Sequence, residues 1–137
     1  MNKILVLVFG LALNHVANAN ENNFRCLQSI NLNKPIKLQF NYPQDSEKTG
    51  LVTYGNSALS IPVRLKSEKT IREVPNGQPW LFQSTWEEIT NAGIGGRYVI
   101  TSQAADIYEF KYVRKDGKVF MFKVNIDAST ENGCQWK

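Results

Sequence analysis

Histidine is nearly absent from this chain of 137 residues, in which His15 is the one example. It lies in an N-terminal segment, residues 1–19, with the pattern of a cleaved leader, so we expect the working protein to contain no imidazole. Without imidazole, Ser-His-Asp and Cys-His nucleophilic sites are excluded, together with most zinc hydrolases. We therefore expect a binding protein and not an enzyme.

The leader pattern combines a short positive start with an apolar run and a cleavage signal. The positive start ends at Lys3, the apolar run covers residues 4–13, and Ala17-Asn18-Ala19 has the small residues that a signal peptidase requires. The run is shorter than the roughly 20 residues of a membrane-spanning helix. We expect one exported domain, residues 20–137, in the periplasm or on the outer surface of a Gram-negative bacterium, with no transmembrane segment.

Cysteine is also scarce, since Cys26 and Cys134 are the only two. They lie near the two ends of the expected domain and form no Cys-x-x-Cys motif, so a redox centre is not indicated. Two distant cysteines in an exported protein are expected to form one structural disulfide.

A large excess of charge of one sign is missing as well. With Lys3 removed, 15 basic residues stand against 12 acidic residues, which gives a net charge of +3. The basic residues are spread along the chain and form no concentrated stripe, so we interpret them as a solvated surface and expect no nucleic acid partner. Contact with an acidic glycan or a lipid headgroup stays open as an alternative to the protein partner that we expect.

What the chain does contain is alternation of apolar and polar residues with a period of two, which is typical of half-buried strands. Residues 36–42 and 51–54 are predicted strands. The inward face of a third strand is predicted to consist of Leu59, Ile61, Val63 and Leu65. Pro62 falls on the outward face of that strand, where proline is tolerated at a sheet edge or a bulge. The charged, turn-rich residues 67–79 are predicted to be an exposed connection.

The second half of the chain begins with a predicted strand at residues 80–89, with a short helical turn at 87–89 as the alternative. Gly93-Ile94-Gly95-Gly96 is predicted to interrupt regular structure before a further strand at 98–101.

A final hairpin is predicted from residues 107–113 and 119–126 around Lys115-Asp116-Gly117. A three-residue turn with a bulge at Gly117 collects the aromatic side chains on one face, whereas a two-residue turn does not. The predicted cross-strand pairs are Tyr112 with Phe120, Phe110 with Phe122, and Tyr108 with Val124.

Several short strands separated by turns indicate an all-β domain, either a barrel or a sandwich. An antiparallel β-barrel of about eight strands is favoured because closure removes exposed sheet edges. The aromatic core candidates are Trp80, Trp86, Tyr108, Phe110, Tyr112, Phe120 and Phe122.

Acid–base chemistry would have to use carboxylates, and the available ones are Glu87, Glu88, Asp106 and Glu109. They have no diagnostic spacing, so all four are interpreted as solvated surface acids. The glycine-rich segment lacks the Lys-Ser/Thr of a phosphate loop, and no calcium-loop pattern is present. We expect no catalytic residue, no metal and no cofactor.

Several short segments, in this order, resemble a known family. They are Phe24-Arg25-Cys26, Phe40-Asn41-Tyr42, Gly50-Leu51-Val52-Thr53-Tyr54, Ile61-Pro62-Val63-Arg64-Leu65, Gly95-Gly96-Arg97-Tyr98 and the late Cys134. Together they resemble the small periplasmic or surface-exposed inhibitors of C-type lysozyme, a group that includes the neisserial adhesin complex protein.

The resemblance implies an eight-stranded antiparallel barrel whose loops block the active-site cleft of lysozyme. In the membrane-bound branch of the family, a loop serine and a loop lysine approach the enzyme's catalytic acids. The serine of that Ser-Gly-x-x-Tyr pattern has no counterpart before Tyr98, and Arg97 or Lys115 can supply a cation instead. The expected partner-binding residues are Gly95, Gly96, Arg97, Tyr98, Lys115, Asp116 and Lys118.

Three functions from different classes follow. The first is an exported binding protein that inhibits host C-type lysozyme or acts as a surface adhesin. The second is a periplasmic immunity protein that neutralises a toxin from a competing bacterium. The third is a carboxylate-dependent hydrolase of cell-wall glycan, which the missing catalytic apparatus disfavours.

Overall fold

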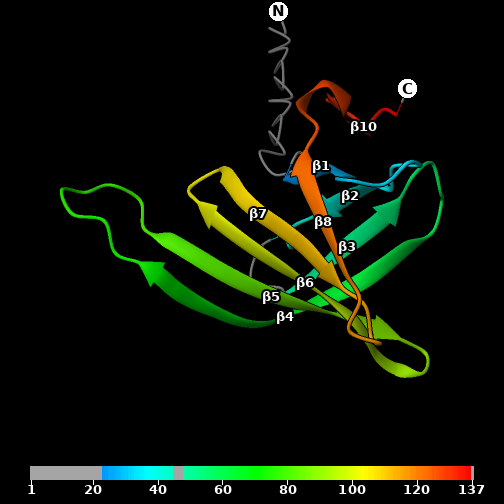
Figure 1. Cartoon of the computed structure of the whole chain (residues 1–137), viewed down its shortest axis with the longest axis horizontal. Coiled ribbons are helices and arrows are strands. Elements are labelled where there is room, and N and C mark those ends of the chain that lie inside the picture. The colour runs from blue at the N-terminus through cyan, green and yellow to red at the C-terminus, as the bar shows by residue number, and fades with distance from the viewer. Residues whose placement is uncertain (1–22, 45–47, 137) are drawn as a thin grey trace, which may run out of the picture.

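Eight antiparallel strands, each paired with its neighbour in sequence, close into a barrel when β8 pairs with β1 (Figure 1). This computed structural model describes residues 23–44 and 48–136, so the predicted leader and its cleavage point lie outside the described residues. The barrel strands are β1 (Phe24–Ser29), β2 (Lys37–Asn41), β3 (Thr49–Tyr54), β4 (Ser60–Arg72), β5 (Leu81–Thr90), β6 (Gly93–Gln103), β7 (Asp106–Val113) and β8 (Val119–Val124). The predicted all-β barrel of about eight strands is confirmed.

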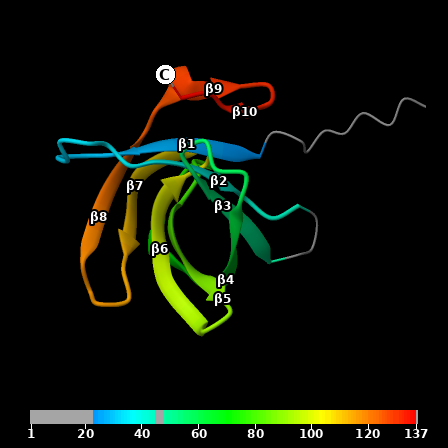
Figure 2. The same cartoon turned by 90° about the vertical axis from the view of Figure 1, so that its right-hand side faces the viewer.

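The chain continues beyond the barrel as a short C-terminal flap, residues 126–136. It contains a single 3-10 turn (Ile126–Ala128) and a hairpin of β9 (Ser129–Thr130) and β10 (Gly133–Cys134), which lies over β1 (Figure 2). The Cys26–Cys134 disulfide joins the flap to β1 across 108 residues of sequence, with a Cα–Cα distance of 5.7 Å, so the predicted pairing is confirmed. Phe24, Cys26 and Ala128 form a small buried cluster beneath the flap.

Strand β4 is longer than its sequence pattern predicts. The segment predicted as an exposed connection from residue 67 remains paired with β5 until Arg72 lies opposite Leu81. Residues 66–72 are exposed, and a ribbon that faces water on both sides needs no apolar alternation.

Leu59 precedes β4 and is exposed, so its predicted inward position is wrong. Pro62 lies one residue before the β4–β5 ladder begins at Val63, so it removes no bond from that ladder.

Strand character also persists through the glycine-rich segment. The predicted interruption at residues 93–96 is wrong, because β6 begins at Gly93 and continues to Gln103. Strand β5 ends at Thr90, and the alternative of a helical turn at 87–89 is wrong as well.

The β7–β8 hairpin has the predicted turn and most of the predicted register. The Arg114 backbone N–H donates to the Lys118 carbonyl at 2.8 Å, and Gly117 adopts a φ of 92°, as a three-residue turn with a glycine bulge requires. The ladder pairs Tyr112 with Phe120 and Phe110 with Phe122.

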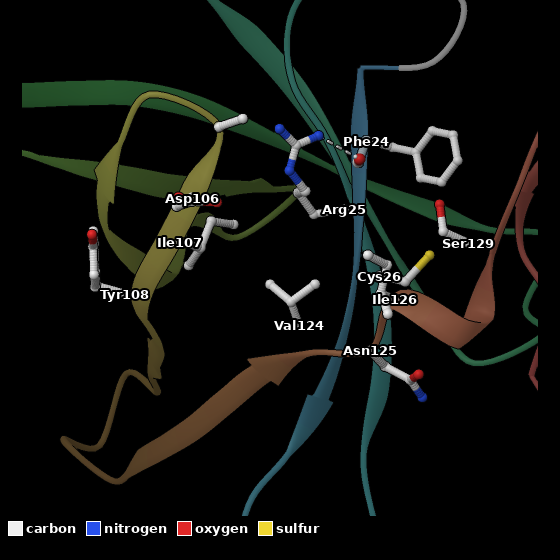
Figure 3. A pocket seen from close by; sticks show the side chains of 11 residues that line it. Phe24, Arg25, Cys26, Asp106, Ile107, Tyr108, Val124, Asn125, Ile126 and Ser129 are labelled. Atoms are coloured by element: carbon white, nitrogen blue, oxygen red, sulfur yellow. Dashed lines mark hydrogen bonds between the residues drawn. The ribbon is translucent and has the colours of Figure 1, made fainter. Parts of the chain in front are cut away.

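The third predicted pair, Tyr108 with Val124, is absent from this ladder (Figure 3). Thr101 and Ser102 of β6 lie opposite Glu109 and Ile107, which leaves Tyr108 as an extra residue in β7. The bulge reverses the alternation beyond that point, so Ile107 packs against the core and Tyr108 turns outward.

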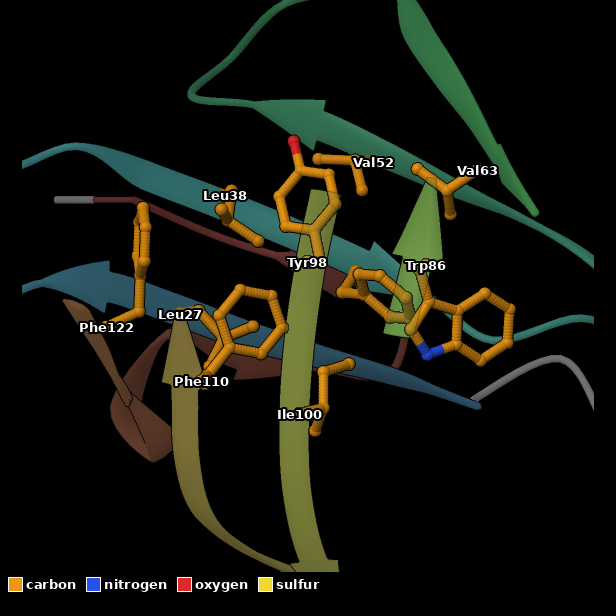
Figure 4. Close-up of a cluster of buried hydrophobic side chains, with 10 residues drawn as sticks. Leu27, Leu38, Val52, Val63, Trp86, Tyr98, Ile100, Phe110 and Phe122 are labelled. Atoms are coloured by element: carbon orange, nitrogen blue, oxygen red, sulfur yellow. The ribbon is translucent and has the colours of Figure 1, made fainter. Parts of the chain in front are cut away.

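Aromatic and branched side chains fill the barrel interior (Figure 4). The Phe40 ring lies at the centre, with edge-on contacts to Trp86, Tyr98 and Phe110 at centroid distances of 5.4, 6.1 and 5.8 Å. Five of the seven aromatic core candidates pack in or against this cluster, and the other two, Trp80 and Tyr108, are exposed.

Candidate partner-binding site

A hollow of about 170 Å³ lies at the end of the barrel where β6 begins and the β7–β8 hairpin turns. Pairing of β6 with β7 places Arg97 opposite Val113, which brings the hairpin turn beside the glycine-rich segment. Residues from both segments therefore meet, although they are about twenty positions apart in the sequence. We call this feature the cationic hollow; it is lined by Glu87, Ile94, Gly95, Gly96, Arg97, Val113, Arg114, Lys115 and Gly117.

The charges around the cationic hollow differ in how they are engaged. Lys66 binds the carboxylate of Glu87 at 3.0 Å. Asp116 binds Arg114 at 2.6 Å, and the hydrogen bond from Arg114 is the main cause that lowers the pKa of Asp116 to about 2. Within the described residues, Arg97 and Lys115 are exposed and form no ion pair, so their charges are available to a partner.

Not all of the seven expected contact residues line the cationic hollow. Gly95, Gly96, Arg97 and Lys115 do. Tyr98 is 0 % exposed and supports the hollow from beneath. Asp116 holds Arg114, and the Lys118 ammonium lies 5.2 Å from the centroid of the Phe120 ring. Whether the four lining residues bind a partner stays a prediction.

A buried carboxylate lies beneath the cationic hollow and was not identified from the sequence. Glu88 is 7 % exposed, and the Tyr98 hydroxyl donates a hydrogen bond to its Oε1 at 2.9 Å. Tyr98 is also hydrogen-bonded to the Tyr54 hydroxyl, and Tyr112 interacts with the Glu88 carboxylate. The interpretation of Glu88 as a surface acid is wrong. The period of two could have placed Glu88 inward, since it lies two residues after the buried Trp86.

This network explains why the floor of the cationic hollow is glycine. A Cβ atom at Gly95 would lie 2.8 Å from Oε2 of Glu88, and one at Gly96 would lie 2.6 Å from Cζ of Tyr112. Neither distance is compatible with a side chain unless its neighbours move. The two glycines therefore let β6 pass directly over the buried network.

The tyrosines of this network predict that the protein loses stability in alkali. Burial, followed by the negative charge of Glu88, raises the pKa of Tyr112 from 10.0 to about 12, and burial raises the pKa of Tyr54 and Tyr98 as well. Above the unfolded pKa of about 10, the folded state therefore binds more protons than the unfolded state, and stability falls as pH rises. Thermal unfolding measured between pH 8 and 12 should show a steadily decreasing midpoint above about pH 10.

Two single variants test whether the tyrosines of the network cause this loss of stability in alkali. Tyr112→Phe removes one titrating network hydroxyl and should make the alkaline decline shallower. Tyr108→Phe removes an exposed hydroxyl outside the network and should leave the decline as it is. A midpoint that does not change with pH, or an equal effect of both variants, would contradict this role of the network.

Comparisons with protein-family models, curated proteins and solved structures found no match to this chain. No helix in the described part of the chain is long and apolar enough to cross a membrane. In residues 23–44 and 48–136, no group of three or more histidine, cysteine or acidic side chains is placed to hold a metal ion.

Proposed function

We propose that this protein is an exported binding protein that inhibits C-type lysozyme, and that the cationic hollow is the surface that enters the enzyme's cleft. The observation that carries the proposal is the meeting of Arg97 and Lys115, two exposed cations without ion pairs in the described residues, around one hollow. The catalytic groups of lysozyme are two carboxylic acids, which are suitable partners for such cations.

The residues around the cationic hollow are held in place, which supports its insertion into the enzyme's cleft without rearrangement. The network of Glu88 and three tyrosines fixes the floor from beneath, and the three-residue turn fixes the hairpin that carries Lys115. A pre-organised surface loses little conformational freedom on binding, so more of the contact energy appears as affinity. The barrel interior is filled by the aromatic cluster, which favours binding through the end of the barrel.

The disulfide supports export. A bond between Cys26 and Cys134 persists most readily in an oxidising compartment, such as the periplasm or the cell surface. Such a location brings the protein to the same side of the inner membrane as cell-wall glycan and any lysozyme that attacks it.

The test is the lysis of a peptidoglycan suspension by C-type lysozyme in the presence of excess purified protein. The unchanged protein should slow lysis. Arg97→Ala and Lys115→Ala should each raise the concentration needed for half inhibition about tenfold, since each removes a charge-assisted hydrogen bond.

Matched controls come from two exposed cations at the other end of the barrel. Arg72 lies opposite Leu81 at the far end of β4, and Lys123 lies opposite Gln28 near the end of β8. Arg72→Ala and Lys123→Ala should change half inhibition less than about twofold. Undiminished lysis together with no complex in size-exclusion chromatography would remove the proposal.

A further inference from the structure

A second concave surface lies at the opposite end of β7 from the cationic hollow. It is a groove of about 560 Å³ between β7 and β1, with the end of β8 at its base (Figure 3). We call it the seam groove, because it opens beyond the end of β8, the strand that closes the barrel between β7 and β1. Ile107, Val124 and Arg25 point into it from the three strands.

The seam groove exists because β8 leaves the barrel early. Of the described residues in β7, only 110–113 pair with β8, so the ladder ends two residues after the bulge at Tyr108. The Asn125 backbone N–H donates to the Cys26 carbonyl at 2.8 Å, after which the chain turns at Ile126. The disulfide then holds the C-terminal flap over β1, so the flap does not continue along β7.

Two strand edges consequently face each other across the seam groove. On the β7 side, residues 106–109 extend beyond the β7–β8 ladder. On the β1 side, residues 24–25 extend beyond the β1–β8 ladder, which begins at Leu27. The β7 edge presents backbone N–H and C=O groups that can pair with an added strand, whereas on the β1 edge the Phe24 carbonyl already accepts from Nη1 of Arg25. Because β8 is antiparallel to both β1 and β7, a strand continuing the line of β8 would be antiparallel to both edges.

The side chains of the seam groove suit an extended segment with alternating apolar residues. Val124 is 39 % exposed at the base, and Ile126 is 78 % exposed at the rim, whereas the Tyr108 side chain turns away toward Gln103 of β6. The charges of Arg25 and Asp106 are opposite, so the groove does not favour a strongly charged segment. Nη1 of Arg25 donates to the Phe24 carbonyl at 2.9 Å, and other N–H groups of the guanidinium remain to bind carbonyls of an added backbone.

We propose that the seam groove binds an extended segment of a partner protein by strand addition. About four or five residues of the segment lie between β7 and β1 and continue the sheet, at a rise of about 3.3 Å per residue. Backbone hydrogen bonds provide the affinity, and the apolar contacts with Val124 and Ile107 select alternate side chains. This site is separate from the cationic hollow and does not depend on lysozyme inhibition.

The test uses a displayed library of random linear dodecapeptides, selected on the disulfide-bonded protein and counter-selected on Val124→Trp, which fills the base of the groove. Peptides with alternating apolar residues should be enriched. A synthetic copy of an enriched peptide should slow amide hydrogen exchange at residues 106–109 and at Phe24. Val124→Trp should weaken its binding at least about tenfold, whereas Val119→Trp, at the other end of β8, should change it less than about twofold.

Further measurements distinguish strand addition from binding through side chains alone. A copy of the peptide methylated at alternate backbone nitrogens cannot form the ladder and should not bind. Arg97→Ala, which impairs lysozyme inhibition if the proposed function holds, should bind the peptide normally. Failure of any peptide to be enriched, equal binding of the methylated copy, or protection of amides elsewhere would overturn the proposal. Self-association that Val124→Trp abolishes would assign the groove to a second copy of the chain and would overturn it as well.

Discussion

Replacing Cys26 and Cys134 together by serine should lower the free energy of unfolding by about 4 to 5 kcal/mol. The disulfide closes a loop that spans almost the whole described chain, with a sequence separation of 108 between its cysteines, and a long closed loop restricts the unfolded state most. Denaturant unfolding of the double variant and of the unchanged protein, monitored by tryptophan fluorescence, measures this difference.

The unchanged protein with its disulfide chemically reduced is the matched control, because it lacks the bond but keeps both side chains. It should unfold at nearly the same denaturant concentration as the double variant. Two results together would show that the bond only fastens the flap to β1. They are a loss of amide hydrogen-exchange protection that is confined to the C-terminal flap, and a free energy of unfolding that falls by less than about 1 kcal/mol.

Gly96→Ala should destabilise the protein by about 3 kcal/mol, the upper part of the range for an overfilled core. The added Cβ would lie 2.6 Å from Cζ of Tyr112, so either the ring or the β6 backbone would have to move. The ring packs between Tyr98 and Phe120, at centroid distances of 4.8 and 6.3 Å. The same denaturant unfolding experiment measures the loss.

A double-mutant cycle tests whether the Tyr112 ring is the cause. Tyr112→Ala alone removes packing, but in combination with Gly96→Ala it removes the clash, so the double variant should be more stable than the sum of the single effects by about 2 kcal/mol. Gly117→Ala provides a comparison, because its Cβ would meet nothing within 4 Å and only the φ of 92° is unfavourable. It should cost about 1 kcal/mol. Additive effects at Gly96 and Tyr112 would assign the loss to something other than this contact.

Local signals in the sequence were strong where each strand has one face in the core and one in water. Residues 36–42 alternate clearly, and the structure buries Leu38 and Phe40 of that segment. The hairpin register followed from aromatic alternation and from one glycine that can adopt a positive φ, and both conditions are local.

Alternation and turn residues gave wrong predictions where contacts with distant parts of the chain determine whether a residue is buried and whether it stays in a strand. The outer part of β4 faces water on both sides and carries no alternation, yet its pairing with β5 keeps it extended. Gly95 and Gly96 looked like a break in regular structure, but β6 needs them because Glu88 and Tyr112 lie beneath. The bulge at Tyr108 moved this residue from the expected core to the surface, since a single extra residue reverses which side chains face inward.

The sequence by itself determined the class of fold, the disulfide and the hairpin turn, because alternation, cysteine number and turn residues act over short distances or leave only one pairing. Only the tertiary structure decided that Arg97 and Lys115 share one hollow, that Glu88 is buried beneath it, and that β7 and β1 leave a groove between them. These features depend on the register between strands and on where each ladder ends. Both are set by the packing of the whole barrel, and no short segment of the chain contains that information.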